Sequence, residues 1–212
     1  MSDADTRHAL VFALAHEIGN HLAGIRLEAH LLDEELDARG LARASVAIDS
    51  LAGRAGPLLA LLRPLLAPGA PRAVGSRLAT VLESVRRQLE EEGVGGRPVE
   101  LEIAPEAAAD GPAFEGLHDL LLALVGEPGS LPPGRSPIVF RLGRQGHESE
   151  LVCELPGEVF AEIGAGQGAA PALRGRVLAV AIARVLVADA GGRVELPSES
   201  GRSRIVLRLP RG

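Results

Sequence analysis

Residues 11–36, VFALAHEIGNHLAGIRLEAHLLDEEL, decide the fold, because apolar side chains recur in them at alternating steps of four and three residues. These positions are Val11, Ala15, Ile18, Leu22, Ile25, Ala29, Leu32 and Leu36. The spacing predicts a long helix with a heptad seam along one face. Gly40 follows the stretch and predicts a turn at 38–40.

A second heptad seam follows at once and predicts a partner helix. Its positions are Leu41, Ala44, Ile48, Leu51, Ala55, Leu58, Leu62 and Leu65. Two long helices joined by a short turn form an antiparallel hairpin. Pro57 and Pro64 predict kinks in the second helix.

The first helix carries more apolar surface than one hairpin covers. Outside its seam it presents a second stripe, made of Leu10, Leu14, Leu27 and Leu31. Pairing two hairpins in a four-helix bundle would bury both stripes, so we predict a homodimer.

A stretch rich in Pro and Gly predicts a linker at 68–76, between a hairpin domain at 1–67 and a second domain at 77–212. The second domain mixes helical and alternating patterns. We expect helices at 77–92, 114–125, 158–163 and 173–190, and strands at 98–103, 138–142, 150–155, 193–196 and 203–209. The fold class is therefore α+β, with a two-layer α/β sandwich after the helical hairpin.

Composition excludes several classes of function. The chain of 212 residues has a net charge of −6, no Trp or Tyr and four Phe, which argues against a nucleic-acid partner. Its one cysteine, Cys153, excludes an internal disulfide and a multi-cysteine zinc site, and the spacing of the histidines predicts no metal site. Acids near the N-terminus and the lack of a run of ~20 apolar residues predict a cytoplasmic protein with no membrane partner.

The residues that suggest chemistry lie on the first predicted helix. His16 follows the seam position Ala15, so we expect its imidazole to point to solvent. Asn20 lies one turn further on the same face, and Glu17 is adjacent in the chain. An exposed imidazole whose tautomer is set by a carboxylate is a competent nucleophile for phosphoryl groups. On a random exposed helix, such a histidine is more often an ordinary surface residue.

The segment HEIGNHLAGIRLEAHLL, residues 16–32, resembles the phospho-acceptor box of histidine kinases. The resemblance covers the hairpin at about 8–66, and residues 74–210 resemble the ATP-binding domain of that family, a Bergerat-like sandwich. The motifs that match best there are AIARVLV (181–187), AGGRVEL (190–196) and RIVLRLP (204–210). The resemblance implies that the hairpin dimerises and that His16 accepts a phosphoryl group.

The chain departs from the family at three nucleotide-binding boxes. Glu127 stands where the resemblance places a magnesium-binding Asn, and Glu154 is an approximate substitute for the Asp of an Asp-x-Gly-x-Gly turn. Where the family has a Gly-x-Gly phosphate loop, the chain has VLAV, with Val177 and Ala179 in place of glycines. The nearby GAGQG at 164–168 matches no phosphate-loop motif. We therefore predict a degenerate site that binds no ATP.

Three functions follow from these residues. The favoured one is a histidine phosphotransferase of a two-component phosphorelay, in which His16 exchanges phosphoryl groups with aspartates of response-regulator receiver domains. Glu17 and Asn20 would assist, and the receiver would supply Mg²⁺, so no cofactor of the chain's own is expected. The second is a non-enzymatic module that dimerises with a cognate histidine kinase or sequesters a receiver. The third is an ATP-dependent kinase with a divergent site.

Overall fold

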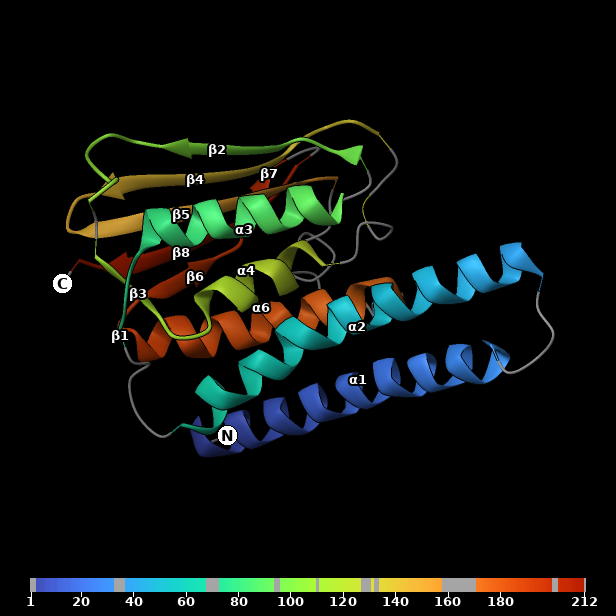
Figure 1. Cartoon of the computed structure of the whole chain (residues 1–212). Helices are drawn as coiled ribbons and strands as arrows, with labels where there is room; N and C mark the ends of the chain where they lie inside the picture. The colour runs from blue at the N-terminus through green and yellow to red at the C-terminus, as the bar shows by residue number, and fades with distance from the viewer. Residues whose placement is uncertain are drawn as a thin grey trace. The chain divides into compact units, whose positions relative to one another are not determined.

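The computed structural model describes residues 3–32, 37–67, 73–93, 96–109, 111–126, 131, 134–157, 171–199 and 202–211. The chain divides into two compact units, Met1–Leu66 and Ala67–Gly212. The first unit is a helical hairpin and the second is a mixed α/β domain (Figure 1).

Helices α1 (Asp3–Leu32) and α2 (Ala38–Leu66) form the predicted hairpin. The turn is placed differently from the prediction. Gly40 lies in the first turn of α2, and its N–H donates to Asp37 Oδ1 at 2.8 Å. Asp37 therefore caps the start of α2, as a short polar side chain does at a helix N-terminus. The helix also continues through Pro57 and Pro64.

The face that α1 turns inward coincides only in part with the predicted seam. Leu14 and Ile18 are buried, whereas Ala15 is exposed and Leu22 keeps 55% of its surface exposed. Both apolar stripes of α1 were visible in the sequence, but a single partner helix covers only part of them. Of the seven predicted seam positions that the structure describes, Ala15, Leu22 and Ala29 are exposed.

Gly24 marks a close approach of the two helices. A Cβ atom placed on Gly24 would lie 3.0 Å from Leu51 Cδ1 of α2. The small residue in α1 therefore lets the leucine of α2 pack against its backbone. Among the described helices, α2 is long and apolar enough to cross a membrane, by length and composition only, and 11% of its apolar stretch is buried.

The second unit is built on a mixed sheet with the strand order β2-β4-β5-β8-β6. β2 and β4 are parallel, and the other neighbours in this order are antiparallel. The strands are β2 (Val99–Ile103), β4 (Ile138–Gln145), β5 (Glu148–Pro156), β6 (Arg193–Glu195) and β8 (Arg202–Pro210), with β7 (Ser198–Glu199) paired to β8. A separate two-stranded sheet joins β1 (Ala73–Arg77) and β3 (Pro112–Phe114).

Three helices cover one face of the large sheet, which gives the two layers that the sequence predicts (Figure 1). They are α3 (Leu78–Glu92), α4 (Leu117–Val125) and α6 (Pro171–Asp189). Strand β5 turns Leu151, Cys153 and Leu155 toward the core, all fully buried. The alternate residues of β5, among them Glu150 and Glu154, belong to the opposite face of the sheet.

Three short strands were not predicted. β1 occupies residues 73–77, most of which we assigned to the linker at 68–76, and β3 includes Phe114, which we assigned to a helix. The sequence of β1, AVGSR, has no alternation of apolar and polar residues, and β3 and β7 have only three and two residues. The predicted helix at 158–163 and the glycines at 164–168 lie outside the described residues.

The α6–β6 turn explains the paired glycines Gly191 and Gly192. Gly191 has φ 77°, which favours glycine. A Cβ atom on Gly192 would lie 2.1 Å from the backbone oxygen of Arg208 in β8, so the turn approaches that strand too closely for a side chain. This close approach lets α6 lead directly into the sheet it covers.

Candidate functional site

His16 and Asn20 lie in the middle of α1 with both side chains exposed. The helix is continuous through both residues, so their spacing of four places them one turn apart on one face. The buried neighbours Leu14 and Ile18 fix which face of α1 points inward. The isolated hairpin therefore presents the imidazole of His16 to solvent, as the sequence predicts.

Glu17 makes its described contact with a different histidine. Its Oε1 lies 3.9 Å from Nε2 of His21, one turn further along α1. The exposed fractions of the two side chains are 20% for Glu17 and 12% for His21. This pair is partly withdrawn from solvent, beside exposed His16, and the predicted action of Glu17 on His16 remains a prediction.

Large apolar side chains remain exposed on the hairpin. In α1 they include Phe12 at 75%, Leu22 at 55% and Leu27 at 61%. Phe12 precedes His16 by four residues, so it shares the exposed face of His16. Leu14, which we placed in the second apolar stripe of the first helix, is fully buried and belongs to the hairpin core.

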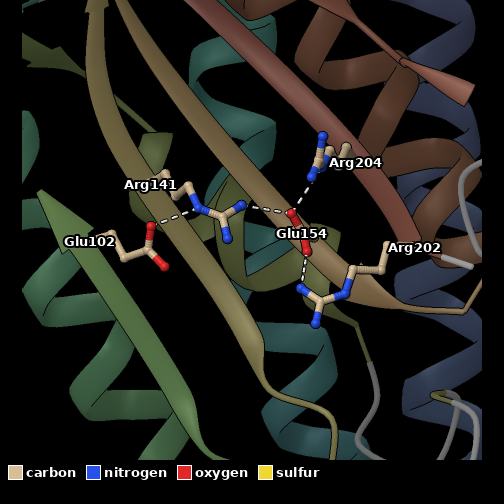
Figure 2. Close-up of polar contacts among 5 residues, drawn as sticks. All are labelled: Glu102, Arg141, Glu154, Arg202 and Arg204. Carbon is tan, nitrogen blue, oxygen red and sulfur yellow. Dashed lines mark hydrogen bonds and ion pairs between the residues drawn. The ribbon is translucent and has the colours of Figure 1, made fainter. Parts of the chain in front are cut away.

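Glu154 does not occupy a nucleotide-reading position. Its carboxylate lies on the face of the sheet opposite the helices, where it accepts hydrogen bonds from three arginines (Figure 2). Arg141 Nη1 lies 2.6 Å and Arg204 Nε 2.9 Å from Oε2, and Arg202 bonds to Oε1. Burial would raise the pKa of Glu154, but the hydrogen bonds from Arg202, Arg141 and Arg204 outweigh it and lower the pKa to about 2.

The residue that faces the helices at this point is Leu155. With Gly157, which has φ 84°, taken as the glycine of an Asp-x-Gly turn, the acid position of the turn falls on Leu155. Leu155 is fully buried and its side chain has no polar atom. The strand therefore offers an apolar side chain where the resemblance requires a carboxylate.

Of the other two degenerate boxes, the structure describes the Val177–Val180 run and not Glu127. The Val177–Val180 run lies inside α6, with Ala179 and Val180 buried and Val177 partly exposed. Since it belongs to a helix, this run provides no glycine loop for phosphates. Glu127 lies outside the described residues. The described part of the chain shows no group of three or more His, Cys, Asp or Glu side chains arranged to hold a metal ion.

At the two described boxes, the residues differ from those that the resemblance requires for a nucleotide. The carboxylate of Glu154 is on the far face of the sheet, Leu155 lies in its place, and helix occupies the position of the phosphate loop. This region also contains Arg176, a buried residue that no sequence motif identified. Arg176 is 1% exposed and bonds to the end of α4.

Solved structures with this fold include histidine kinases. A bacterial phosphotransferase matches with a TM-score of 0.56 and 19% identity, over 98% of this chain and 97% of its own. The Acinetobacter baumannii histidine kinase AdeS matches with a TM-score of 0.54 and 12% identity, over 92% and 97%. The nucleotide-free catalytic domain of histidine kinase ThkA matches with a TM-score of 0.50 and 16% identity, over 64% and 95%.

No family model and no curated protein matches the chain. Together, the hairpin and the sandwich define the class: the chain has the fold of a histidine kinase core. Along nearly the whole length of both chains, that fold is also the fold of a bacterial phosphotransferase.

Proposed function

We propose that the chain is a phosphotransfer protein of two-component signalling, in which His16 carries the phosphoryl group without using ATP. The observation that carries this proposal is an exposed His16 with an exposed Asn20 one turn away on the hairpin, in a chain whose α/β unit has altered nucleotide boxes. The end-to-end fold match with a bacterial phosphotransferase supports the same class.

The chemistry asks little of the protein beyond placing the imidazole. A nitrogen of His16 attacks the phosphorus of an aspartyl-phosphate on a receiver domain, so a P–N bond forms while the P–O bond to the aspartate breaks. The aspartate leaves as a carboxylate, and the imidazole gives up its N–H proton. A second receiver then reverses the step at its own aspartate. The receiver brings Mg²⁺, which neutralises charge on the phosphoryl oxygens.

The flanking residues have separate proposed roles. Glu17 sets the tautomer of the imidazole and accepts its proton, and Asn20 orients a phosphoryl oxygen or a water molecule. The exposed apolar residues near His16, such as Phe12, would meet the receiver. A homodimer, a cytoplasmic location and a cognate histidine kinase as upstream partner complete the proposal.

Transfer of a label tests the proposal directly. Receiver domains of the host, labelled with radioactive phosphate on their aspartates, are mixed with the full chain, the His16→Ala variant, and two control variants, His8→Ala and His30→Ala. His8 and His30 are exposed histidines of the same helix. We expect label on the wild type and on both controls, and none on His16→Ala. If no phosphorylated receiver labels the chain, the proposal is wrong.

A parallel reaction separates the rival functions. The chain is incubated with Mg²⁺ and ATP labelled at the γ-phosphate, with no receiver present. We expect no label on His16, because the described boxes lack the polar groups that would hold the nucleotide. Label on His16 would make the chain a kinase with a divergent site. If His16→Ala leaves the biological output of the pathway unchanged, the chain acts as a binding module.

A further inference from the structure

Arg176 is the largest side chain that the described core buries completely, with 1% of its surface exposed. It lies in the N-terminal half of α6, one residue before Val177. A buried guanidinium is costly unless its donors are satisfied and its charge is balanced. Arg176 therefore needs hydrogen-bond acceptors and negative charge around its guanidinium group.

The end of α4 supplies part of that environment. The Nε and Nη2 atoms of Arg176 both donate to the backbone oxygen of Val125, at 3.0 and 2.5 Å. Val125 is the last residue of α4, where the carbonyl groups lack partners within the helix and carry partial negative charge. The planar donor pair of the guanidinium matches such a carbonyl group.

The next residue is shaped around the same guanidinium. Gly126 has φ 66°, and a Cβ atom on it would lie 2.9 Å from Nε of Arg176. A side chain at position 126 would therefore meet the arginine as well as strain the backbone. Its N–H bonds back to the oxygen of Leu122, which keeps the end of α4 closed against the arginine.

The positive charge of Arg176 also affects the pKa of a residue in the sheet. Burial raises the pKa of Cys153 in β5 to about 12, and the positive charge of Arg176 opposes that rise. Arg176 therefore belongs to α6, bonds to the end of α4 and acts through its charge on Cys153 of β5. Figure 1 shows α4 and α6 side by side under the sheet.

We infer that the C-terminal end of α4 is a site for a planar cation of the guanidinium class, and that the chain fills it permanently with its own Arg176. The internal cation ties α4 to α6. Arg176 immediately precedes one altered nucleotide box and contacts Gly126, which immediately precedes another at Glu127. The link between this cation site and the altered nucleotide boxes rests on the proposed function, in which the chain does not use ATP.

Chemical rescue tests the site in the full chain. The Arg176→Ala variant removes the cation and leaves space for one, whereas Arg176→Met removes the charge and keeps most of the volume. We expect both to lower the melting temperature by about 10 °C, because the end of α4 loses its buried donors. Arg184→Ala, which removes an exposed arginine from the same helix, is the matched control.

Each variant is then melted with about 20 mM ethylguanidinium chloride, far below the molar range in which guanidinium unfolds proteins. We expect it to restore several degrees to Arg176→Ala and nothing to Arg176→Met or Arg184→Ala, with equal sodium chloride restoring none of them. Equal effects on Arg176→Ala and Arg184→Ala, or no effect on Arg176→Ala, would overturn the inference.

A measurement on the wild type keeps the inference testable if Arg176→Ala does not fold. In nitrogen-15-labelled protein, the Nε–H signal absent from an Arg176→Lys variant identifies Arg176. We expect this proton to exchange with water far more slowly than the Nε–H of exposed arginines. Exchange as fast as theirs would refute a closed cation site. Neither result affects labelling of His16, so the two proposals fail independently.

Discussion

At the scale of single residues, Glu154 shows how strand pairing can place one carboxylate among several cations. Its arginine partners come from β4 and β8, the two strands that flank β5 in the sheet. Arg141 also donates to Glu102 Oε2 of β2 at 2.7 Å, so the ion-pair network spans four strands (Figure 2). Three cations around one nearly inaccessible carboxylate hold it in its charged form.

This environment predicts a stability that depends on pH. The folded pKa of Glu154 is about 2, below the value of about 4.3 expected in an unfolded chain. A lowered acid pKa stabilises the folded state above pH ~4.3, and that contribution is lost as the pH falls toward the folded pKa. Glu154→Gln should therefore lower the free energy of unfolding by about 2 kcal/mol at pH 7, since arginines lose a buried partner.

Urea unfolding at a series of pH values measures this difference. The gap between wild type and Glu154→Gln should narrow from pH ~5 to pH ~2, because protonated Glu154 resembles glutamine in shape and charge. The matched control is Glu100→Gln, an exposed acid of β2. A gap that stays constant down to pH ~2 would contradict the role assigned to Glu154.

Little of this network was predictable from the sequence. Arg141, Arg202 and Arg204 lie 13, 48 and 50 residues from Glu154, and only the sheet order makes them neighbours. The same holds for Arg176 and Val125, which are 51 residues apart. We matched Glu154 to the Asp of the Asp-x-Gly-x-Gly turn because it is acidic. The side of the strand that faces the helices instead places Leu155 at that position.

At the scale of elements, long periodic segments were predicted well and short ones were not. The hairpin helices and α3 and α6 have enough turns for their apolar spacing to be recognised. The inward face of α1 was harder, because two apolar stripes run along it and periodicity alone does not say which one meets α2. The exposure of His16 was predictable because it lies outside both stripes.

The pairing of Glu17 with His21 within α1 allows a prediction about phosphotransfer. If Glu17 serves His16, as proposed, Glu17→Gln should slow labelling of His16 from a phosphorylated receiver by about 10² to 10⁴-fold. His21→Gln should change that rate little, although it removes the contact described for Glu17. Rapid-quench kinetics on both variants measure the two rates.

The rates of the Glu17→Gln and His21→Gln variants can also contradict the proposed role of Glu17. If the carboxylate of Glu17 acts only through His21, both variants should slow labelling equally. Circular dichroism of each variant checks that α1 keeps its helix content, because a change of local structure would affect both rates. Equal slowing with an intact helix would remove Glu17 from the proposed mechanism.

At the scale of the whole molecule, the exposed apolar side chains of the hairpin are the reason for the predicted homodimer. Leu22 and Leu27 of α1 and Val46 of α2 each keep more than half of their surface exposed. Burying one such side chain is worth about 1.5–3 kcal/mol, and a symmetric dimer buries each of them twice. The predicted seam residues Ala15, Leu22 and Ala29 are exposed in the single chain, and the predicted dimer would cover them.

The predicted homodimer can be tested by placing charge on this surface. Leu22→Glu and Leu27→Glu should each weaken dimerisation by about 100-fold or more, because both copies of the carboxylate would be buried in an apolar interface. Ala188→Glu, an equal change of charge at an exposed position of α6, should leave the dimer intact. Sedimentation equilibrium over a range of concentrations measures the three dissociation constants against the wild type. A wild-type chain that sediments as a monomer at high concentration would contradict the dimer, and His16 would then have to be presented by a single hairpin.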